Sequence, residues 1–187
     1  INSKPIRFLP LIWEFLLNVL VLLILFTLIF FLLVVMKSKS QQDLHEIYSE
    51  KGRSLYLGDY NAALDKKNLR KLGIKTVLTA ASGLRISYPT SINHKVYEAL
   101  DTDSYDMSKH FEDAFDFIEE GLKQGSVLVH CAAGISRSAT IVIAYIMIKN
   151  ALSFEGAFKL VKGKRSVVSP NWGFQKQLRS LEKSLKF

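Results

Sequence analysis

The sequence predicts an α/β fold in which helices flank a central, mostly parallel sheet, preceded by one transmembrane helix. Three observations support this prediction. Strand-like and helix-like patterns alternate between residues 45 and 187, which favours a sheet with helices on both faces. The stretch SVLVH at Ser126–His130 is a short apolar run of the kind found in buried central strands. Residues 11–36 contain a long run without basic or acidic side chains after Glu14, which is typical of a membrane span.

The apolar run Phe15–Met36 is 22 residues long and carries no charge. A helix of that length spans about 33 Å, enough for a hydrocarbon core of roughly 30 Å. A cleaved signal peptide has a shorter apolar region, a core helix this apolar requires a larger protein around it, and a wrongly assigned chain start is a third alternative. We predict an N-terminal tail over residues 1–10, a transmembrane helix over 11–36, a polar linker over 37–44 and one globular domain over 45–187.

The first half of the domain begins with a strand at Ser54–Tyr60, where turn residues bound an apolar alternation. Apolar residues at helical spacing then predict a helix over Asn61–Leu72, which a glycine stops. The β-branched stretch IKTVLTA at Ile74–Ala80 predicts a second strand. Residues 81–93 contain glycine, proline and serines and predict a loop, and Lys95–Leu100 is the next expected strand.

A helix with a strong apolar stripe follows. Asp106 or Ser108 is expected to cap its N-terminus, and Gly121 and Gly125 mark its end. The stripe that faces the core is formed by residues at helical spacing. Its members are Phe111, Phe115, Ile118 and Leu122.

The second half of the domain contains the central strand Ser126–His130 and three further helices. Ala139–Ile148 is apolar on all sides, so it is either a helix buried under the sheet or another strand, and its position after a glycine-containing turn favours the helix. Phe154–Val161 and Pro170–Leu185 are the last two predicted helices, the latter with proline in its first turn.

Composition excludes several classes of protein. The net charge of +8 favours anionic partners in general, but no arginine-rich tail, zinc-finger spacing or aromatic RNA motif accompanies it, so no nucleic-acid binding is predicted. A single cysteine excludes an intramolecular disulfide and a metal site of several thiolates. The four histidines lack ligand spacing, so no metal site is predicted.

The only cysteine, Cys131, lies in the stretch VHCAAGISRSAT between the central strand and the apolar helix. A strand, a tight loop and a helix form an anion site, because the loop amides point inward and the helix adds the positive end of its dipole. Small side chains and Gly134 allow the backbone to curl around a tetrahedral anion. Arg137, six residues after the cysteine, offers a planar fork of donors to two phosphate oxygens.

The same positive field favours the thiolate form of Cys131, which is then positioned for in-line attack on phosphorus. Ser138 is placed to donate a hydrogen bond to the sulfur and to stabilise the thiolate as a leaving group. His130 either orients the loop through hydrogen bonds or is a satisfied buried histidine. The alternative for Cys131 is a buried structural cysteine, which leaves the arginine, glycine and serine around it unexplained.

The stretch HCAAGISRS resembles the signature of the cysteine-dependent protein tyrosine phosphatases. The longer stretch RSATIVIAYIMIKNALSFEGAFKLVKGKRSVVSPNWGFQKQL is similar to the dual-specificity branch of that family, which includes the MAP kinase phosphatases, and the similarity extends from about Glu46 to Leu185. The resemblance implies a phosphotyrosine-phosphatase-like fold and a phosphate-binding loop. The loop residues that match are Ala132, Ala133, Gly134, Ile135, Ser136 and Arg137.

The family uses an aspartate as proton donor, and the stretch YEALDTDSYDMSKHF offers three. The family pattern matches Asp101, about thirty residues before the cysteine. Asp101 is therefore expected to protonate the leaving oxygen and later to activate water. The alternatives are Asp103, a solvated loop charge, and Asp106, a helix cap.

The resemblance implies hydrolysis of phosphate monoesters on phosphoproteins, at phosphotyrosine and phosphoserine or phosphothreonine, through a cysteinyl-phosphate intermediate and without a metal or cofactor. A membrane anchor favours phospholipid substrates instead, but the loop has none of the lysines that inositol-lipid phosphatases carry. A third possibility, a phospho-binding scaffold without activity, is expected to have lost Cys131, Arg137 or Asp101.

The basic residues that flank the apolar run are equal in number on both sides, so charge does not set its orientation. A thiolate nucleophile requires a reducing compartment, which predicts a membrane protein with its catalytic domain in the cytosol. Lys162, Lys164 and Arg165 form a basic cluster, either a solvated helix end or a contact for an acidic substrate segment or anionic lipid. No oligomeric state is predicted.

Overall fold

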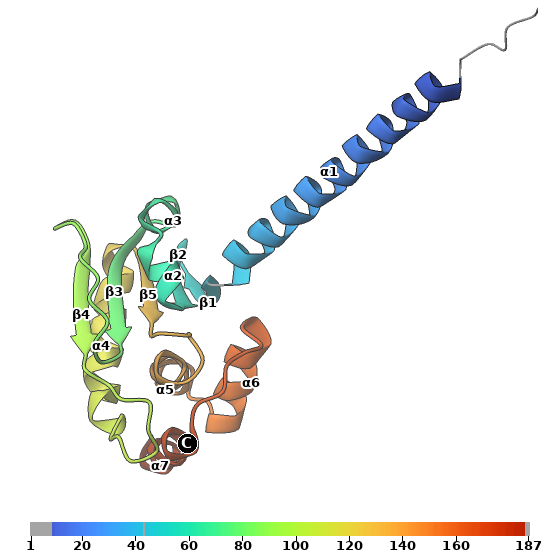
Figure 1. The fold of residues 1–187 in the computed structure, drawn as a ribbon. Coiled ribbons are helices and arrows are strands. Elements are labelled where there is room, and N and C mark those ends of the chain that lie inside the picture. The colour runs from blue at the N-terminus through green and yellow to red at the C-terminus, as the bar shows by residue number, and fades with distance from the viewer. Residues whose placement is uncertain (1–8, 43, 186–187) are drawn as a thin grey trace, which may run out of the picture. The chain divides into compact units, whose positions relative to one another are not determined.

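The computed structural model describes residues 9–42 and 44–185, with side chains for residues 13–32 and 44–185. The chain divides into two units, Ile1–Gln41 and Gln42–Phe187. The first contains one long helix and the second contains the sheet (Figure 1).

Helix α1 is continuous from Leu9 to Gln42. Its stretch Trp13–Leu32 is long and apolar enough to cross a membrane, and none of that stretch is buried. A signal sequence near the N-terminus meets the same criterion, so the helix alone does not establish a membrane protein. The helix also continues through most of residues 37–44, the segment predicted as a linker. Lys and Gln are good helix formers and no Gly or Pro interrupts them, so a helix that starts in the apolar run extends at little cost.

The second unit is built on a five-stranded sheet in the order β1-β2-β5-β3-β4. β1 is antiparallel to β2, and every other neighbouring pair is parallel. The prediction of a mostly parallel sheet flanked by helices is therefore confirmed. The strands are β1 Leu44–Glu50, β2 Arg53–Gly58, β3 Ile74–Ala80, β4 Asn93–Tyr97 and β5 Ser126–His130.

Strand β1 was not predicted from the sequence. It forms a hairpin with β2 through Lys51 and Gly52, both of which have positive φ angles. Only Ile47 of this edge strand is buried, so the sequence LHEIYSE lacks the apolar alternation that identifies a half-buried strand. The Lys-Gly pair forms the turn of this hairpin, and hydrophobic periodicity does not detect such a turn.

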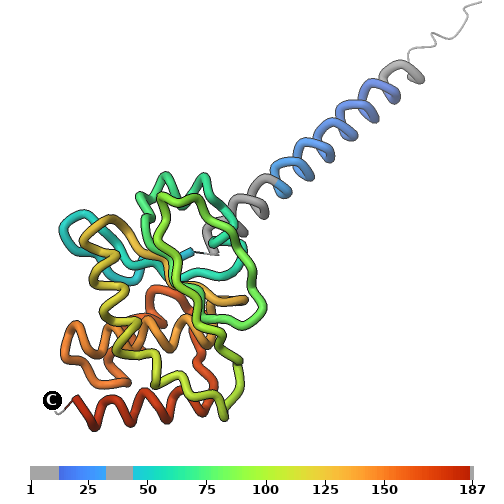
Figure 2. The backbone as a smooth tube through the Cα atoms, turned by 90° about the vertical axis from the view of Figure 1, so that its left-hand side faces the viewer, coloured from blue at the N-terminus to red at the C-terminus, as the bar shows by residue number. Residues whose placement is uncertain are grey.

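Helices cover both faces of the sheet (Figure 1). α2 and α3 pack on one face; α4 and α5 pack on the other, with α6 and α7 against α5. Figure 2 shows α7, in red, running across the end of the domain beside the orange α5. The helices are α2 Tyr60–Leu64, α3 Lys66–Lys71, α4 Phe111–Gln124, α5 Arg137–Asn150, α6 Phe154–Lys164 and α7 Trp172–Leu185, and a 3-10 turn at Ser108–His110 precedes α4.

The central strand β5 supplies both hydrophobic cores. Val127 and Val129 point to the core under α4–α7, whereas Leu128 points to the smaller core under α2 and α3, because side chains alternate along a strand. All buried members of both cores come from residues 47–178. The second unit therefore has its own hydrophobic core, as a domain that can fold independently does.

Two predicted helices differ at their boundaries. The segment Asn61–Leu72 forms two helices, because Asp65 ends α2 and its side chain then accepts a hydrogen bond from the Asn68 amide to cap α3. α7 begins at Trp172, where Asn171 Oδ1 accepts from the Phe174 amide as a cap, so Pro170 precedes the helix instead of occupying its first turn.

Strands β3 and β5 have the predicted boundaries, and the other elements differ by a few residues. The strand expected at Lys95–Leu100 is β4, which ends at Tyr97. Gly121 lies inside α4 rather than at its end, whereas Gly125 is the C-cap. A Cβ at Gly121 would lie 2.8 Å from methyl carbons of Thr76 and Val127, so the glycine allows the helix to pack closely on the sheet. The apolar segment Ala139–Ile148 is the buried helix α5, as predicted.

Candidate active site

The loop between β5 and α5 starts at Cys131 and curves back at Gly134, whose φ of +66° is in the left-handed region. A Cβ at this glycine would lie 2.5 Å from the Gly58 carbonyl oxygen, so only glycine allows the loop to pack against the end of β2. The Tyr60 amide also donates to the Ala132 carbonyl at 3.1 Å. The loop is thus fixed to the ends of two neighbouring strands.

The sulfur of Cys131 lies at the base of this loop, with the residue 1% exposed. It accepts a hydrogen bond from the Gly134 amide at 3.2 Å and another from Ser138 Oγ at 3.1 Å. The second is the contact that the sequence predicted for Ser138. Both donors stabilise negative charge on sulfur, as a nucleophilic thiolate requires.

Arg137 is the first residue of α5, and its side chain extends toward the segment after β4. One guanidinium nitrogen donates to the Ala99 carbonyl at 3.2 Å, and Nε lies 3.5 Å from Asp101 Oδ2 as an ion pair. The buried Nε has no hydrogen-bond partner among the described residues, because the carboxylate is in ion-pair range without hydrogen-bond geometry. The Nε–H group of the Arg137 guanidinium can therefore still donate a hydrogen bond to an anion.

The structure brings Asp101 to the loop. Its Oδ1 accepts from Ser136 Oγ at 2.6 Å and from Asn171 Nδ2 at 3.0 Å, and the Asn171 amide donates to Ser136 Oγ at 3.1 Å. Ser136 therefore does not cap α5 with its side chain, which leaves the first-turn amides of that helix to the site. The sequence did not predict Asn171 as a site residue. Its position two residues before Gly173 in SPNWGF indicates only the start of a helix.

The other two aspartates lie in different contacts. Asp103 Oδ1 accepts from the Gly173 amide at 3.2 Å. Asp106 Oδ1 accepts from the Ser108 amide at 3.0 Å, at the first residue of the 3-10 turn. The expectation that Asp106 or Ser108 caps α4 is wrong, because α4 follows that turn directly and its N-cap residue, His110, makes no side-chain cap hydrogen bond. Neither contacts the loop residues in the hydrogen bonds of the described structure, whereas Asp101 does.

His130 is fully buried and bonded on both ring nitrogens. Nε2 lies 2.7 Å from Thr79 Oγ1, and Nδ1 lies 3.2 Å from the Cys131 carbonyl oxygen. Burial lowers the pKa of His130 to about 4, so the ring is neutral at physiological pH. Thr79 Oγ1 also lies 2.8 Å from His94 Nε2. Thr79 was missed because a threonine in a buried strand gives no functional signal in the sequence.

The prediction of an exposed basic cluster is wrong for Arg165. Its side chain is buried, with the residue 3% exposed. Nε donates to the Gly134 carbonyl at 2.9 Å and Nη2 to the Ala133 carbonyl at 3.1 Å, while Nη1 lies 2.9 Å from His45 Nδ1. These contacts hold the Ala133 and Gly134 carbonyls toward Arg165, while the Gly134 amide points to the Cys131 sulfur.

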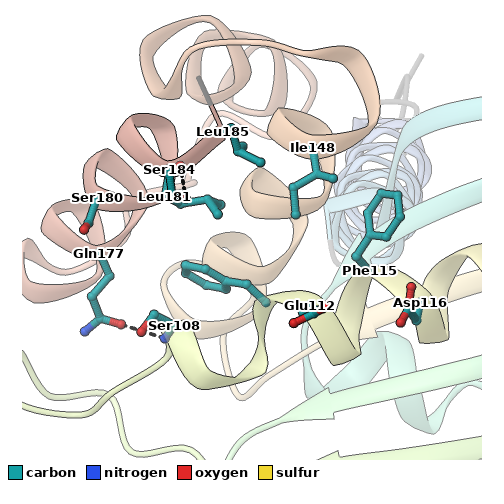
Figure 3. Close-up of a pocket in the computed structure, with 11 residues that line it drawn as sticks. Ser108, Glu112, Phe115, Asp116, Ile148, Gln177, Ser180, Leu181, Ser184 and Leu185 are labelled. Carbon is teal, nitrogen blue, oxygen red and sulfur yellow. Dashed lines mark hydrogen bonds between the residues drawn. The ribbon is translucent and has the colours of Figure 1, made fainter. Parts of the chain in front are cut away.

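A hollow of about 670 Å³ lies elsewhere, between α4, α5 and α7. Figure 3 shows Gln177 reaching Ser108 at one end and Phe115 beside Ile148 at the other. It includes none of the residues predicted to be catalytic. Within residues 9–42 and 44–185, no group of three His, Cys, Asp or Glu side chains is placed to hold a metal ion.

Comparisons with known proteins agree with this geometry. The family model for the dual specificity phosphatase catalytic domain matches residues 55–184. Dual specificity protein phosphatase 1 of Arabidopsis thaliana is 44% identical over 135 residues, which cover 72% of this chain and 68% of the relative. Dual specificity protein phosphatase 26 of Homo sapiens is 43% identical over 139 residues, which cover 71% of this chain and 65% of the relative.

Solved structures share the fold. Human DUSP28 aligns with a TM-score of 0.71 and 27% identity, covering 78% of this chain and 96% of its own. The human tyrosine phosphatase-like serine/threonine/tyrosine-interacting protein aligns with a TM-score of 0.71 and 31% identity, covering 76% and 97%. The part of this chain that aligns with the two structures is therefore almost entirely its second unit.

Proposed function

The chain belongs to the dual-specificity protein phosphatase family, and from this premise we propose that it hydrolyses phosphate monoesters on phosphoproteins through a cysteinyl-phosphate intermediate. One observation carries the proposal. The buried sulfur of Cys131 accepts hydrogen bonds from Gly134 and Ser138 inside a loop that also presents Arg137 and the carboxylate of Asp101.

In the first step the Cys131 thiolate attacks phosphorus, an S–P bond forms and the P–O bond of the ester breaks. The departing oxygen takes a proton from Asp101, the general acid. Arg137 and the loop amides hold the three non-bridging oxygens and stabilise the charge that develops on them. The Nε of Arg137 supports this role, because it has no hydrogen-bond partner among the described residues and a bound phosphoryl group would supply one.

In the second step a water molecule attacks the phosphorus of the intermediate and gives its proton to the Asp101 carboxylate. The S–P bond breaks, inorganic phosphate leaves and the thiolate is regenerated. The hydrogen bond from Ser138 at 3.1 Å stabilises that leaving thiolate. His130 is not a base in this scheme, because its pKa of about 4 and its two bonds suit it to holding the Cys131 carbonyl in place.

We place the substrates among phosphotyrosine and phosphoserine or phosphothreonine proteins, in line with the names of the relatives. The membrane span proposed for Trp13–Leu32 would hold the catalytic unit near a membrane, with that unit on the cytosolic side, where thiolates stay reduced. The same span favours phosphoinositides as a second candidate substrate, although the loop residues between Cys131 and Arg137 include no lysine to match additional phosphates.

The test uses residues 42–187, the unit with its own core. We expect it to hydrolyse a small aryl phosphate, to be inhibited by vanadate and to be unaffected by chelators, whereas Cys131→Ser is inactive but folded by circular dichroism. A wild-type fragment that binds phosphopeptides without hydrolysing them would show a scaffold instead. Comparing turnover of a phosphotyrosine peptide with that of a phosphoinositide in micelles separates the two substrate classes.

A further inference from the structure

Large apolar side chains are exposed on the segments that form the candidate active site. Within the catalytic unit, six such side chains are exposed among the described residues, and four of them lie in or beside these segments. Single exposed apolar residues are ordinary, but a group of them around one opening marks a binding surface. The four are Leu100, Ile135, Val167 and Trp172, with exposed fractions from 37% to 62%; we name them the apolar rim.

Each rim residue is fixed to the catalytic groups by the backbone next to it. Ile135 belongs to the loop itself, and its carbonyl accepts from the Ser169 amide at 2.9 Å, which holds the segment containing Val167 against the loop. Leu100 precedes Asp101 directly. Trp172 follows Asn171, whose side-chain amide donates to Asp101 at 3.0 Å.

The Trp172 side chain is held in place although it is 62% exposed. Lys176 Nζ lies 3.2 Å from the centroid of its ring, one helical turn further along α7. This cation–π contact orders the indole without burying it. A preordered aromatic surface loses little conformational entropy when a ligand covers it.

A substrate that places its phosphoryl group on the buried Cys131 sulfur comes next to this rim, because the rim residues belong to the segments that supply the loop, Asp101 and Asn171. The residues on either side of the phosphorylated residue are then the groups that cover the rim. Apolar side chains at those positions would release water from both surfaces on binding, whereas small polar ones would gain nothing from the contact.

We propose that the apolar rim selects phosphoprotein segments with aliphatic or aromatic side chains next to the phosphorylated residue, and that Trp172 is its main specificity-determining residue. This inference rests on the proposed function, since it concerns the substrates of the same site. It also names a role for residues outside the hydrogen-bonded site, namely Val167 and Trp172.

The experiment compares two phosphotyrosine peptides that differ only in carrying leucine or serine on both sides of the phosphotyrosine. With the fragment 42–187, kcat/KM is expected to be about tenfold higher for the leucine peptide, the size typical of a contact that depends on one tryptophan. Trp172→Ala should reduce this ratio to about twofold or less, and Trp172→Phe should restore most of it. Val167→Ala should reduce it less, and the matched control Val96→Ala, on β4, should leave it unchanged.

A second readout does not depend on turnover. Trp172 is the only tryptophan of the fragment, since the other tryptophan of the chain is Trp13. In the Cys131→Ser fragment the leucine peptide should shift Trp172 emission to the blue and bind more tightly than the serine peptide. If wild type cleaves neither peptide nor an aryl phosphate, the proposed function fails and this binding comparison still decides the inference.

Equal kcat/KM for both peptides, or equal affinity in the fluorescence titration, would overturn the proposal. So would a Trp172→Ala variant that keeps the wild-type preference for leucine. A blue shift on vesicles of phosphatidylcholine and phosphatidylserine, together with no discrimination between the peptides, would assign the rim to a membrane surface and likewise refute it.

Discussion

Acidification from pH 7 to pH 4.5 is expected to destabilise the catalytic unit through His130, and His130→Gln is expected to remove that part of the loss. Burial lowers the pKa of His130 from 6.5 to about 4. Between these two values the unfolded chain binds a proton that the folded chain does not bind. The free energy of unfolding therefore falls as the pH falls through this window, and above pH 6.5 the group contributes no pH dependence.

The magnitude follows from the size of the shift. Each pH unit inside the window costs at most about 1.4 kcal/mol, so the change from pH 7 to pH 4.5 amounts to about 2 kcal/mol. Burial also lowers the pKa values of His94 and His110, which adds to the loss in the same direction. His110 is present in wild type and variant alike, so its contribution cancels in the comparison. His94 shares the Thr79 hydroxyl with His130, so its contribution is measured separately with His94→Gln.

The assay is urea unfolding of residues 42–187 at the two pH values, followed by circular dichroism and Trp172 fluorescence, with equal m-values as the condition for comparison. Glutamine retains a polar group for Thr79, so His130→Gln is expected to fold with lower stability at pH 7 and a smaller pH dependence. His94→Gln is the control for a half-buried histidine. If wild type and His130→Gln lose the same free energy between pH 7 and pH 4.5, His130 is not a buried neutral group and the reasoning is refuted.

Three further substitutions test the loop and the acid. Gly134→Ala should lower kcat for an aryl phosphate by at least about 100-fold, since a Cβ there meets the Gly58 carbonyl at 2.5 Å; unchanged kcat would contradict the loop geometry. Arg165→Lys should lower the free energy of unfolding by about 2 kcal/mol, because it loses the fork that bonds the Ala133 and Gly134 carbonyls, as measured by urea unfolding. Asp101→Asn should lower kcat by roughly 10²–10⁴ for an alkyl phosphate and less for an activated aryl phosphate; equal losses for both would remove Asp101 as the proton donor.

Patterns within short stretches were sufficient for the fold class. The buried strand SVLVH and the all-apolar helix after it could be predicted because burial on every side requires apolar residues throughout. Edge strand β1 could not, because one covered face and an open edge leave Ile47 as its single buried side chain. The predicted helix boundaries were wrong where a side chain such as Asp65 accepts a hydrogen bond from a backbone amide and caps a new helix. Capping depends on side-chain geometry and not on the hydrophobic period.

The residues of the candidate site likewise fall into two groups: those that a local sequence pattern predicts and those that only the fold brings together. Cys131, Arg137 and Ser138 could be placed from the sequence because one strand, one loop and one helix hold them within eight residues. Arg165 was assigned to the surface, because a basic residue after two lysines at a helix end looks solvated until the fold shows the loop carbonyls beside it. Asn171 lies 70 residues from Asp101 along the chain, and their contact exists only because the fold brings the start of α7 next to the segment that follows β4.

By itself, the sequence determined the fold class, the position of the candidate nucleophile, the loop and the apolar N-terminal helix, because each depends on residues close together in the chain. Only the tertiary structure decided which side chains hold the loop, which aspartate faces it and which apolar residues surround its opening. Those contacts join segments far apart in the sequence, and no local pattern of hydrophobicity or spacing records which distant segments a fold brings together.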